Sequence, residues 1–419
     1  MAEQHEKALV PQIRFAGFTD PWEQRKLSDL TDRVSIQSSD SDLPQVEYED
    51  IIPGEGTLNK DLRDKKGGKT GIKFYAGDVL YGKLRPYLMN WLYPQFNGVA
   101  VGDFWVLRAT ECDSSFLYRL VQTGSFQRLA NVSSGSKMPR ADWNLISQSF
   151  FAVPADHAEQ KAIAKGLAEL DTLITLHQRK YDKLCVLKKS MLDKMFPKGG
   201  SLYPEIRFAG FTDPWEQRKL EDYVVVSTAK NVDGRFNKED VLSVSGEYGI
   251  VNQIAFQGRS FAGSSVLNYG IVNTGDIVYT KSPLNSNPYG IIKVNKGIPG
   301  IVSTLYAVYR PQDNVYANFI QVYFEQHERM NNYMHPLVNK GAKNDMKVTA
   351  ENALKGMVTF PSREEQSVIS AFFSRLDSLI TLHQRKYDGC ANPLFLERRI
   401  SCRKPSHQNR CSATTTPSG

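Results

Sequence analysis

The sequence lacks the features of secreted and membrane-spanning proteins. Its five cysteines form no Cys-x-x-Cys pair, which excludes a disulfide scaffold and favours a reducing compartment. No apolar run approaches the roughly 18–20 residues that span a bilayer. The first 14 residues also lack the apolar core of a signal peptide. We therefore expect a cytoplasmic protein without a membrane segment.

Catalytic motifs are equally scarce. Gly67-Gly-Lys-Thr70 ends like a phosphate-binding loop, but the leading glycine of that motif is missing. Ser286-Asn-Pro-Tyr289 is similar to the Asn-Pro-Pro-Tyr of amino-methyltransferases, but it lacks the second proline, and no Gly-rich cofactor turn accompanies it. Asp156, Glu159 and Lys161 fall within one helical turn, where helix capping accounts for them. The seven histidines show no metal-ligand spacing. We expect no enzyme, cofactor or metal site in this chain.

Composition is ordinary for a globular protein, with 41% hydrophobic and 23% charged residues. A length of 419 residues allows two or three domains. The net charge of +7 suggests a polyanionic partner, but residues 389–419 hold five basic residues and one acidic residue, and so +4 of that charge. An argument for nucleic-acid binding must therefore rest on where basic residues are placed.

An internal repeat organises the sequence. The segment Ile13–Leu27 recurs without change at Ile206–Leu220. A second segment, Leu170–Asp182, recurs at Leu376–Asp388 with one substitution. Two copies are too few for a solenoid, so the chain is expected to contain two related halves.

The stretches between the repeated blocks, 28–154 and 221–361, share only a faint skeleton. Gly77-Asp-Val-Leu-Tyr81 parallels Gly275-Asp-Ile-Val-Tyr279, and a lysine follows each at the same spacing. A nearly identical frame with divergent inserts is typical of a scaffold that presents two different recognition surfaces. A recent duplication without functional meaning is the alternative.

Both unlike stretches are expected to fold as α+β domains. They carry β-branched and aromatic residues in partial alternation, punctuated by Gly, Asn and Pro turns. Each ends in a predicted helix, Ser115–Leu129 in the first and Asn318–Tyr333 in the second.

Long helices follow the two unlike stretches. Asp156 is a predicted N-cap, with Glu159 completing a capping box. Apolar residues then recur at alternating spacings of four and three, which indicates a coiled-coil seam. His177 and His383 occupy seam positions, where a polar residue typically fixes register. Pairing of the two seams within the chain is favoured, although pairing with a partner's helices also fits the spacing. The apolar seam residues are Ile163, Leu167, Leu170, Ile174, Tyr181 and Leu184 in the first helix and Ile369, Phe373, Leu376, Ile380 and Tyr387 in the second.

Basic residues with interleaved aromatics and amides lie near the shared Gly-Asp strands and in two later loops. Such side chains suit phosphate contact and base-edge reading. A single Lys or Arg is ordinarily a solvated surface residue, but recurrence at equivalent places in divergent inserts favours a shared role. Tyr81 and Tyr279 lie beside these residues. The candidate DNA-binding residues are Lys83, Arg85, Tyr87, Lys137 and Arg140 in the first half and Lys281, Asn285, Lys343 and Lys347 in the second.

In combination, these motifs resemble the specificity subunits of type I restriction-modification systems. The resemblance covers about residues 11–388. It rests on Phe15-Ala-Gly-Phe-Thr-Asp-Pro-Trp-Glu opening each half, on the Gly-Asp-apolar-apolar-Tyr strand, and on Pro…Glu-Gln…Ile…Leu-Asp…Ile leading into a long helix.

The resemblance implies a non-catalytic subunit with two target recognition domains, each reading one half of a bipartite asymmetric target in double-stranded DNA. It also implies that the long helices form an antiparallel coiled-coil spacer with pseudo-twofold symmetry, which docks two methyltransferase subunits. Restriction/translocase subunits then join. The resemblance further implies that adenine methylation and ATP-dependent DNA cleavage belong to those partners.

The sequence departs from the repeat after Asp388. There the first copy predicts Lys-Leu-Cys-Val-Leu, but the chain continues Gly389-Cys-Ala-Asn-Pro. We expect a disordered, dispensable tail. The expected segments are 1–27 (first repeat block), 28–154 (recognition domain 1), 155–200 (spacer helix and linker), 201–220 (second block), 221–361 (recognition domain 2), 362–388 (shortened spacer helix) and 389–419 (tail).

Two alternatives remain at this stage. The first is a scaffold whose paired α+β modules bind protein or glycan, which sequence-independent DNA binding would favour. The second is a stand-alone methyltransferase or nuclease, which the missing motifs disfavour.

Overall fold

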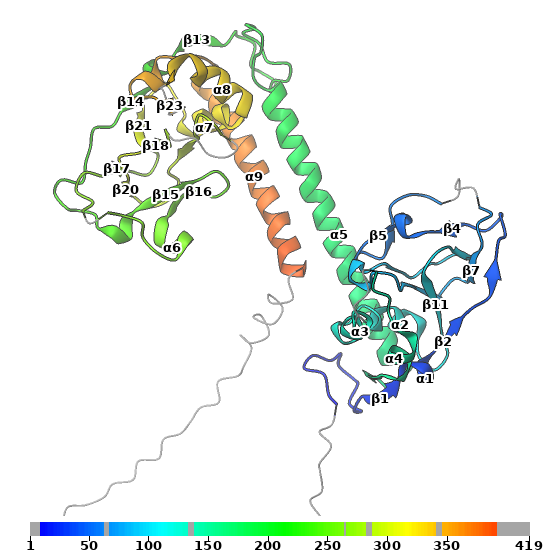
Figure 1. Ribbon diagram of the computed structural model, residues 1–419. Helices are drawn as coiled ribbons and strands as arrows, with labels where there is room; N and C mark the ends of the chain where they lie inside the picture. Colours follow the sequence, from blue (N-terminus) through cyan, green and yellow to red (C-terminus); the bar gives the residue numbers. More distant parts are fainter. Residues whose placement is uncertain are drawn as a thin grey trace, which may run out of the picture. The chain divides into compact units, whose positions relative to one another are not determined.

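A computed structural model describes residues 9–62, 67–132, 138–263, 265–281, 287–340 and 346–391 (Figure 1). The chain divides into two compact units, Met1–Leu173 (unit 1) and Ile174–Gly419 (unit 2). Both units combine helices with antiparallel sheets, and this confirms the predicted α+β class. Within the described ranges, no helix is long and apolar enough to cross a membrane.

Unit 1 is built on two four-stranded sheets. The central sheet is antiparallel with the order β2-β11-β8-β9, and the second has the order β3-β7-β10-β4, in which β10 and β4 are parallel. The central strands are β2 (Thr31–Val34), β8 (Val79–Gly82), β9 (Trp91–Leu92) and β11 (Phe104–Ala109). The remaining strands are β3 (Gln37–Ser38), β4 (Gln45–Val46), β7 (Gly71–Phe74) and β10 (Gly98–Ala100), with a hairpin of β5 (Ile51–Ile52) and β6 (Thr57–Leu58).

Strand β8 shows how the layers of unit 1 form. Successive side chains of a strand point to opposite faces of the sheet. Val79 and Tyr81 accordingly enter the core beneath the helices, whereas Leu80 enters a second core with residues of the other sheet. The central sheet is therefore buried on both faces. The helices of this unit are α1 (Leu27–Leu30), α2 (Ser114–Leu120), α3 (Gly124–Ala130) and α4 (Trp143–Gln148).

Unit 2 repeats the central sheet. Its order, β14-β21-β18-β19, is antiparallel throughout, and smaller two-stranded sheets surround it. The central strands are β14 (Val224–Val226), β18 (Ile277–Tyr279), β19 (Ile292–Val294) and β21 (Ala307–Pro311). The other elements are β15 (Leu242–Ser245), β16 (Gly249–Asn252), α6 (Gln253–Gln257), β17 (Gly270–Val272), β20 (Gly300–Val302), α7 (Ala317–Glu325), α8 (His327–Met334), β22 (Asn339–Lys340) and β23 (Met346–Lys347).

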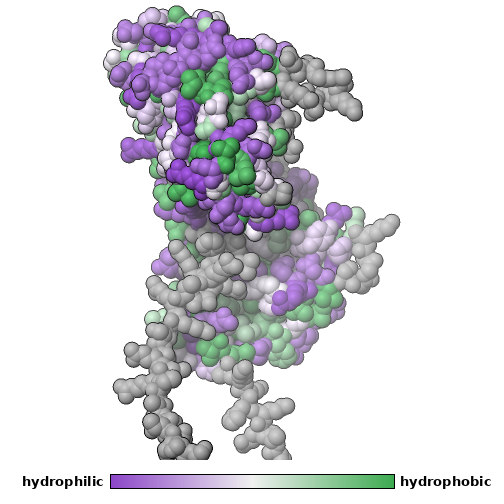
Figure 2. Space-filling view, turned by 90° about the vertical axis from the view of Figure 1, so that its left-hand side faces the viewer, coloured by the Kyte–Doolittle hydropathy of each residue, from purple (hydrophilic) through white to green (hydrophobic). Residues whose placement is uncertain are grey.

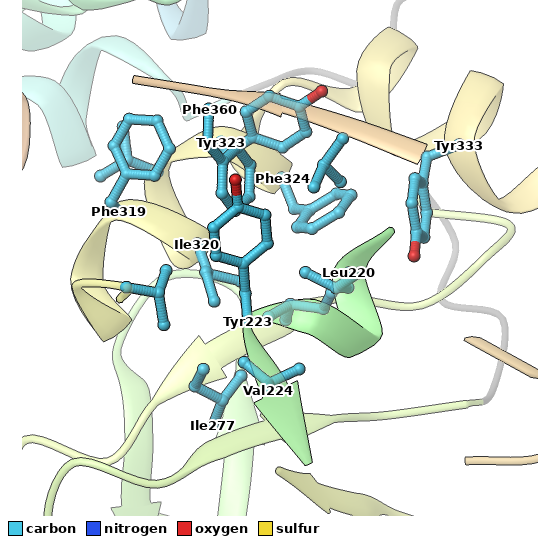
Figure 3. Packing of buried hydrophobic residues seen from close by; sticks show 14 of the residues in the cluster. Leu220, Tyr223, Val224, Ile277, Phe319, Ile320, Tyr323, Phe324, Tyr333 and Phe360 are labelled. Carbon is cyan, nitrogen blue, oxygen red and sulfur yellow. The ribbon is translucent and has the colours of Figure 1, made fainter. Parts of the chain in front are cut away.

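Aromatic rings pack against one another in the main core of unit 2 (Figure 3). The ring of Phe360 lies 4.8 Å from that of Tyr223 and 5.0 Å from that of Phe319. Phe196, just beyond helix α5 (His157–Lys194), belongs to the same core, with its ring 6.3 Å from that of Phe373. Aromatic pairs in such tilted arrangements stabilise a core beyond their buried area.

Two helices predicted as continuous are broken. The expected helix Ser115–Leu129 is α2 followed by α3, because the Thr123 hydroxyl accepts a hydrogen bond from the Phe126 amide at 3.4 Å and so starts a new helix. The expected helix Asn318–Tyr333 is α7 followed by α8, with the extended backbone of Gln326 between them. The single-helix predictions were wrong.

A two-stranded ribbon closes each unlike stretch. Strand β1 (Glu23–Lys26) pairs antiparallel with β12 (Phe150–Val153), and β13 (Glu216–Lys219) pairs antiparallel with β24 (Met357–Phe360). Strands β1 and β13 both lie in the identical repeat block. The divergent inserts therefore begin and end at equivalent ribbons.

Helix α5 and helix α9 (Arg363–Ala391) are the two longest elements. Within unit 2 they run antiparallel side by side (Figure 1): His177 contacts His383, and further along α5, Lys188 contacts Asp377 further back along α9. Helix α9 continues beyond Asp388 to Ala391, and the rest of the predicted tail, 392–419, lies outside the described residues.

Candidate nucleic-acid interface

In unit 1, two candidate cations from distant parts of the chain meet on one carboxylate. The Lys83 ammonium lies 3.7 Å from Asp103 Oδ1, and the Arg140 guanidinium contacts Asp103 Oδ2 through Nη2 at 2.8 Å and Nε at 3.2 Å. The Arg140 side chain is 55% exposed. One carboxylate thus orients two cations whose summed charge exceeds its own, which leaves this surface electropositive.

The backbone holds these cations in place by strand-like hydrogen bonds. The Arg85 amide donates to the Pro139 carbonyl at 2.7 Å, and the Ala141 amide donates to the Lys83 carbonyl at 2.9 Å. Arg85 and Met89 adopt left-handed backbone conformations, with φ of 50° and 57°. Such strain costs of order 1–3 kcal/mol per residue and concentrates at functional sites.

The same loop exposes aromatic and apolar side chains. Tyr87 is 54% exposed, Met89 43%, and Met138, next to Pro139, 52%. We name this set, residues 83–89 with 138–140, the unit 1 basic loop. It brings together the predicted residues Lys83, Arg85, Tyr87 and Arg140. Lys137 lies outside the described residues.

The candidate residues of unit 2 are less completely described. Lys281 has a left-handed backbone with φ of 43°, and its ammonium donates to the Thr304 carbonyl at 3.2 Å. Lys347 lies on β23, where its backbone pairs with Asn339. Asn285 and Lys343 lie outside the described residues.

The two tyrosines of the shared motif face the core. Tyr81 is 0% exposed and Tyr279 is 1% exposed. Their hydroxyls bond to Gln127 and to the Tyr289 carbonyl, and burial raises the pKa of Tyr81 to about 12. Both tyrosines are therefore core residues, although basic residues follow them in the sequence.

The Gly-Asp motif itself is a turn. Gly77 and Gly275 both have φ of 90°, a conformation that favours glycine. The Asp78 carboxylate accepts from the Tyr75 amide at 2.8 Å, and Asp276 accepts from Asn273 at 2.7 Å. The motif thus positions strands β8 and β18, and the lysines that follow them.

Sequence reasoning missed a cation–aromatic surface in unit 2. Tyr248 and Phe256 are exposed with ring centroids 5.5 Å apart, and the Arg259 guanidinium lies 4.5 Å from the ring centroid of exposed Phe261. Figure 2 shows the viewer-facing side of this unit as mostly hydrophilic with separate hydrophobic patches. The signal was present in the basic–aromatic spacing of Arg259 and Phe261, which also suits nucleic-acid contact.

Both repeat blocks are fixed to the start of a long helix by the same ion pair. The Arg14 guanidinium donates two hydrogen bonds of 2.7 Å to the Glu159 carboxylate, and the Arg207 guanidinium donates two of 2.8 and 2.7 Å to the Glu365 carboxylate. Bidentate pairs of this kind are strong and directional. The hydrogen bonds from Arg14, aided by Trp22, lower the pKa of Glu159. Glu159 therefore does not complete a capping box as predicted, although Asp156 does cap the helix by accepting from the Ala158 amide at 2.7 Å.

The glutamines that follow these glutamates, Gln160 and Gln366, also make equivalent contacts in the two units. We call the two Arg–Glu pairs and these glutamine contacts the shared frame. The Gln160 side chain accepts from the Asp113 amide and donates to the Pro154 carbonyl, at 2.7 and 2.8 Å. Gln366 makes the equivalent bonds to Tyr316 and Pro361, both at 2.9 Å. Each unit is thus tied to its helix by the same buried contacts.

The predicted seam residues differ in burial between the two helices. Ile369, Phe373 and Leu376 are 2%, 0% and 5% exposed. Leu167 and Leu170, the repeat equivalents of Phe373 and Leu376, are each 40% exposed. The other predicted seam residues, Ile163, Ile174, Tyr181, Leu184, Ile380 and Tyr387, are half-buried.

Outward-facing leucines, in contrast, match across the repeat. Leu173 and its equivalent Leu379 are 44% and 40% exposed, and Leu176 and Leu382 are 44% and 46% exposed. The two helices thus expose apolar side chains at equivalent positions of the repeat. In the described part of the chain, no cluster of three or more His, Cys, Asp or Glu could hold a metal ion.

Comparison with known proteins gives one curated relative and several solved structures. No protein-family model matches the sequence. The type I restriction enzyme EcoDI specificity subunit of Escherichia coli is 26% identical over 203 residues, which cover 46% of this chain and 46% of that protein. The match thus spans about half the length of this relative.

The fold is similar to the crystal structure of a type I restriction-modification S subunit from M. genitalium, with a TM-score of 0.56 and 11% identity over 96% of this chain and 100% of that chain. The HsdS subunit from Thermoanaerobacter tengcongensis gives a TM-score of 0.40 at 17% identity, over 94% of this chain and 98% of that chain. The E. coli relative and the M. genitalium structure confirm the resemblance that the motifs predicted: in sequence and in fold, the chain is similar to the specificity subunits of type I restriction-modification systems.

Proposed function

We propose that this chain is the DNA-recognition subunit of a type I restriction-modification complex. Unit 1 and unit 2 each read one half of a bipartite, asymmetric target in double-stranded DNA. The observation that carries this proposal is the repeated frame. The Arg–Glu pairs and the Glu-Gln contacts are the same in both units, whereas the surfaces built on them differ in sequence. Such a repeated scaffold would present two different DNA-binding surfaces in equivalent structural positions.

The unit 1 basic loop is the proposed DNA contact of the first half. Lys83 and Arg140 supply charge for phosphates, and Arg85 supplies a planar donor suited to guanine edges. Tyr87 and Met89 add exposed apolar surface. In unit 2 the proposed contacts are Lys281, Asn285, Lys343 and Lys347.

Helices α5 and α9 are the proposed antiparallel coiled-coil spacer, related by a pseudo-twofold axis. The matched exposure of Leu173 and Leu379, and of Leu176 and Leu382, supports docking of two methyltransferase subunits on equivalent surfaces. Restriction/translocase subunits join that assembly. Methylation and ATP-dependent cleavage are then activities of the complex, and this subunit is non-catalytic and cytoplasmic.

Methylome sequencing of cells with and without the gene tests this function. We expect a two-part asymmetric motif, with adenine methylated on both strands, that disappears on deletion and returns on complementation. Unchanged methylation after deletion would contradict the proposal. Sequence-independent DNA binding by the chain purified with methyltransferase subunits would favour a scaffold instead.

A further inference from the structure

Unit 2 contains a cavity of about 950 Å³, and Tyr248 of the cation–aromatic surface is one of its lining residues. It lies between the edge strand β19, the turn joining β15 to β16, and helices α5, α7 and α9. Its volume falls within the range of small-molecule sites. Lys188, Lys293 and Glu325 are among the charged residues that line it.

Lys293 is a buried cation without a partner. The residue is 8% exposed, and no hydrogen bond or ion pair joins its ammonium to any residue in the described ranges. Burial lowers the pKa of Lys293, an effect that the more distant carboxylate of Glu325 opposes. An uncompensated buried charge is costly, and the arrangement therefore calls for a compensating ligand.

Glu325 provides an unused acceptor in the same cavity. Its Oε1 accepts from Lys188 at 2.6 Å, and Lys188 also contacts Asp377 Oδ1 at 2.6 Å. Its Oε2 is buried and makes no hydrogen bond. The cavity therefore offers one free buried cation and one free buried carboxylate oxygen.

The strand of unit 1 that corresponds to β19 is apolar. Lys293 pairs with Val278, and in the equivalent strands Leu92 pairs with Leu80, so that Leu92 stands where unit 2 has Lys293. The next residue, Tyr93, stacks on Tyr118 with ring centroids 5.4 Å apart. The buried lysine of unit 2 is therefore not required by the structure that the two units share.

Glu325 also has a defined counterpart. The equivalent glutamines Gln160 and Gln366 bond to the amides of Asp113 and Tyr316, which aligns these two residues. Nine residues further along each chain segment, Gln122 of unit 1 aligns with Glu325 of unit 2. Unit 1 thus has a leucine at the position equivalent to Lys293 and a glutamine at the position equivalent to Glu325. These two residues are natural choices for substitutions in unit 2.

We propose that this cavity binds a small organic anion, a phosphate or carboxylate that accepts from Lys293 Nζ and carries a hydroxyl that donates to Glu325 Oε2. Such a molecule satisfies both unpartnered groups at once. Lys189 and Lys296 also line the cavity, but so do four further carboxylates, those of Asp193, Glu247, Glu328 and Asp377. Selection for an anion therefore rests on Lys293 and not on the summed charge of the lining.

Thermal unfolding and calorimetric titration of the full chain test this site. The probes are glycerol 3-phosphate, glycerate, inorganic phosphate and glycerol, at an ionic strength held constant with chloride. We expect both hydroxyl-bearing anions to raise the melting temperature by several degrees at millimolar concentration and to give saturable heats, because ligands that bind the folded state stabilise it. Inorganic phosphate should act more weakly, and glycerol should not act.

Variants taken from unit 1 separate this site from general anion effects. Lys293→Leu should fold and lose the response to all anions. Glu325→Gln should lose the preference for glycerol 3-phosphate over inorganic phosphate. Lys355→Leu, at an exposed lysine outside the cavity, should respond like the wild type. No response of the wild type to any anion, or an equal response of Lys293→Leu, would overturn the proposal. Neither result bears on the methylation motif, which tests the DNA-recognition function separately.

Discussion

The Nδ1 atom of His177 lies 3.0 Å from the Nδ1 atom of His383, and the two histidines occupy the same position of the internal repeat. In an antiparallel pair of helices, contact between equivalent residues is what a local twofold axis would produce. The pair therefore marks the proposed centre of the spacer, with equivalent leucines on either side of it.

This histidine pair predicts a loss of stability in acid. Burial lowers the pKa of His383 below its ordinary value of 6.5, and the neighbouring His177, Lys180 and Lys386 lower it further. The folded chain then binds fewer protons than the unfolded chain, so the free energy of unfolding falls as the pH drops below about 6.5. His383→Gln should flatten this slope in urea unfolding measured from pH 8 to 5. His157→Gln, an exposed control, should retain it; an unchanged slope in His383→Gln would refute the assignment.

The pair of Arg207 and Glu365 predicts a stabilising contribution from the frame. Glu365→Ala leaves the guanidinium without its buried acceptor and should lower the free energy of unfolding of unit 2 by about 1.5–3 kcal/mol. Glu159→Ala should act in the same direction on unit 1. Urea unfolding of Arg207→Ala, Glu365→Ala and the double variant gives the coupling between the two residues. Strict additivity of the two substitutions would contradict a direct interaction.

The different burial of equivalent seam residues predicts that alanine substitutions at these positions destabilise the protein to different extents. Phe373 is 0% exposed, so Phe373→Ala should destabilise unit 2 by about 3–5 kcal/mol. Its equivalent Leu167 is 40% exposed, and Leu167→Ala should change stability by less than about 0.5 kcal/mol. Equal losses measured by thermal and urea unfolding would show that both positions are packed.

Elements with a long sequence period were the most predictable. The heptad seam placed a helix after Asp156 and another near Ile369, and both exist as α5 and α9. The class of fold followed from alternating strands and turn residues. Shorter helices were less predictable, because a single side chain such as Thr123 decided where α2 ended and α3 began.

Contacts between distant residues could not be predicted from local patterns. Glu159 has the spacing of a capping box, but Arg14 competes for its carboxylate across 145 residues. Lys83 and Arg140 were both candidates, yet their meeting on Asp103 depends on the pairing of two loops. Basic residues follow Tyr81 in the sequence, but the alternation of side chains along the strand directs Tyr81 into the core.

The unit 1 basic loop predicts salt-sensitive DNA binding. Lys83→Ala with Arg140→Ala should weaken binding of the methyltransferase-bound chain by about 10–100-fold and reduce the salt slope, since each phosphate contact releases counterions. Lys26→Ala is the control. Lys26 and its equivalent Lys219 lie in repeat blocks of identical sequence, so these lysines cannot distinguish one half-site from the other. Fluorescence anisotropy across a range of salt concentrations measures both quantities. Equal losses for the control and the double variant would move the interface elsewhere.

The central claim is that each unit reads its own half of a bipartite target. The most direct measurement is the methylome of cells whose sole copy of this gene carries Lys83→Ala and Arg85→Ala. We predict that base preference is relaxed or lost in one half of the methylated motif, while the other half and the spacing stay unchanged. The matching change at Lys281 should alter the opposite half. A motif that stays intact, or one in which both halves change together, would contradict the account.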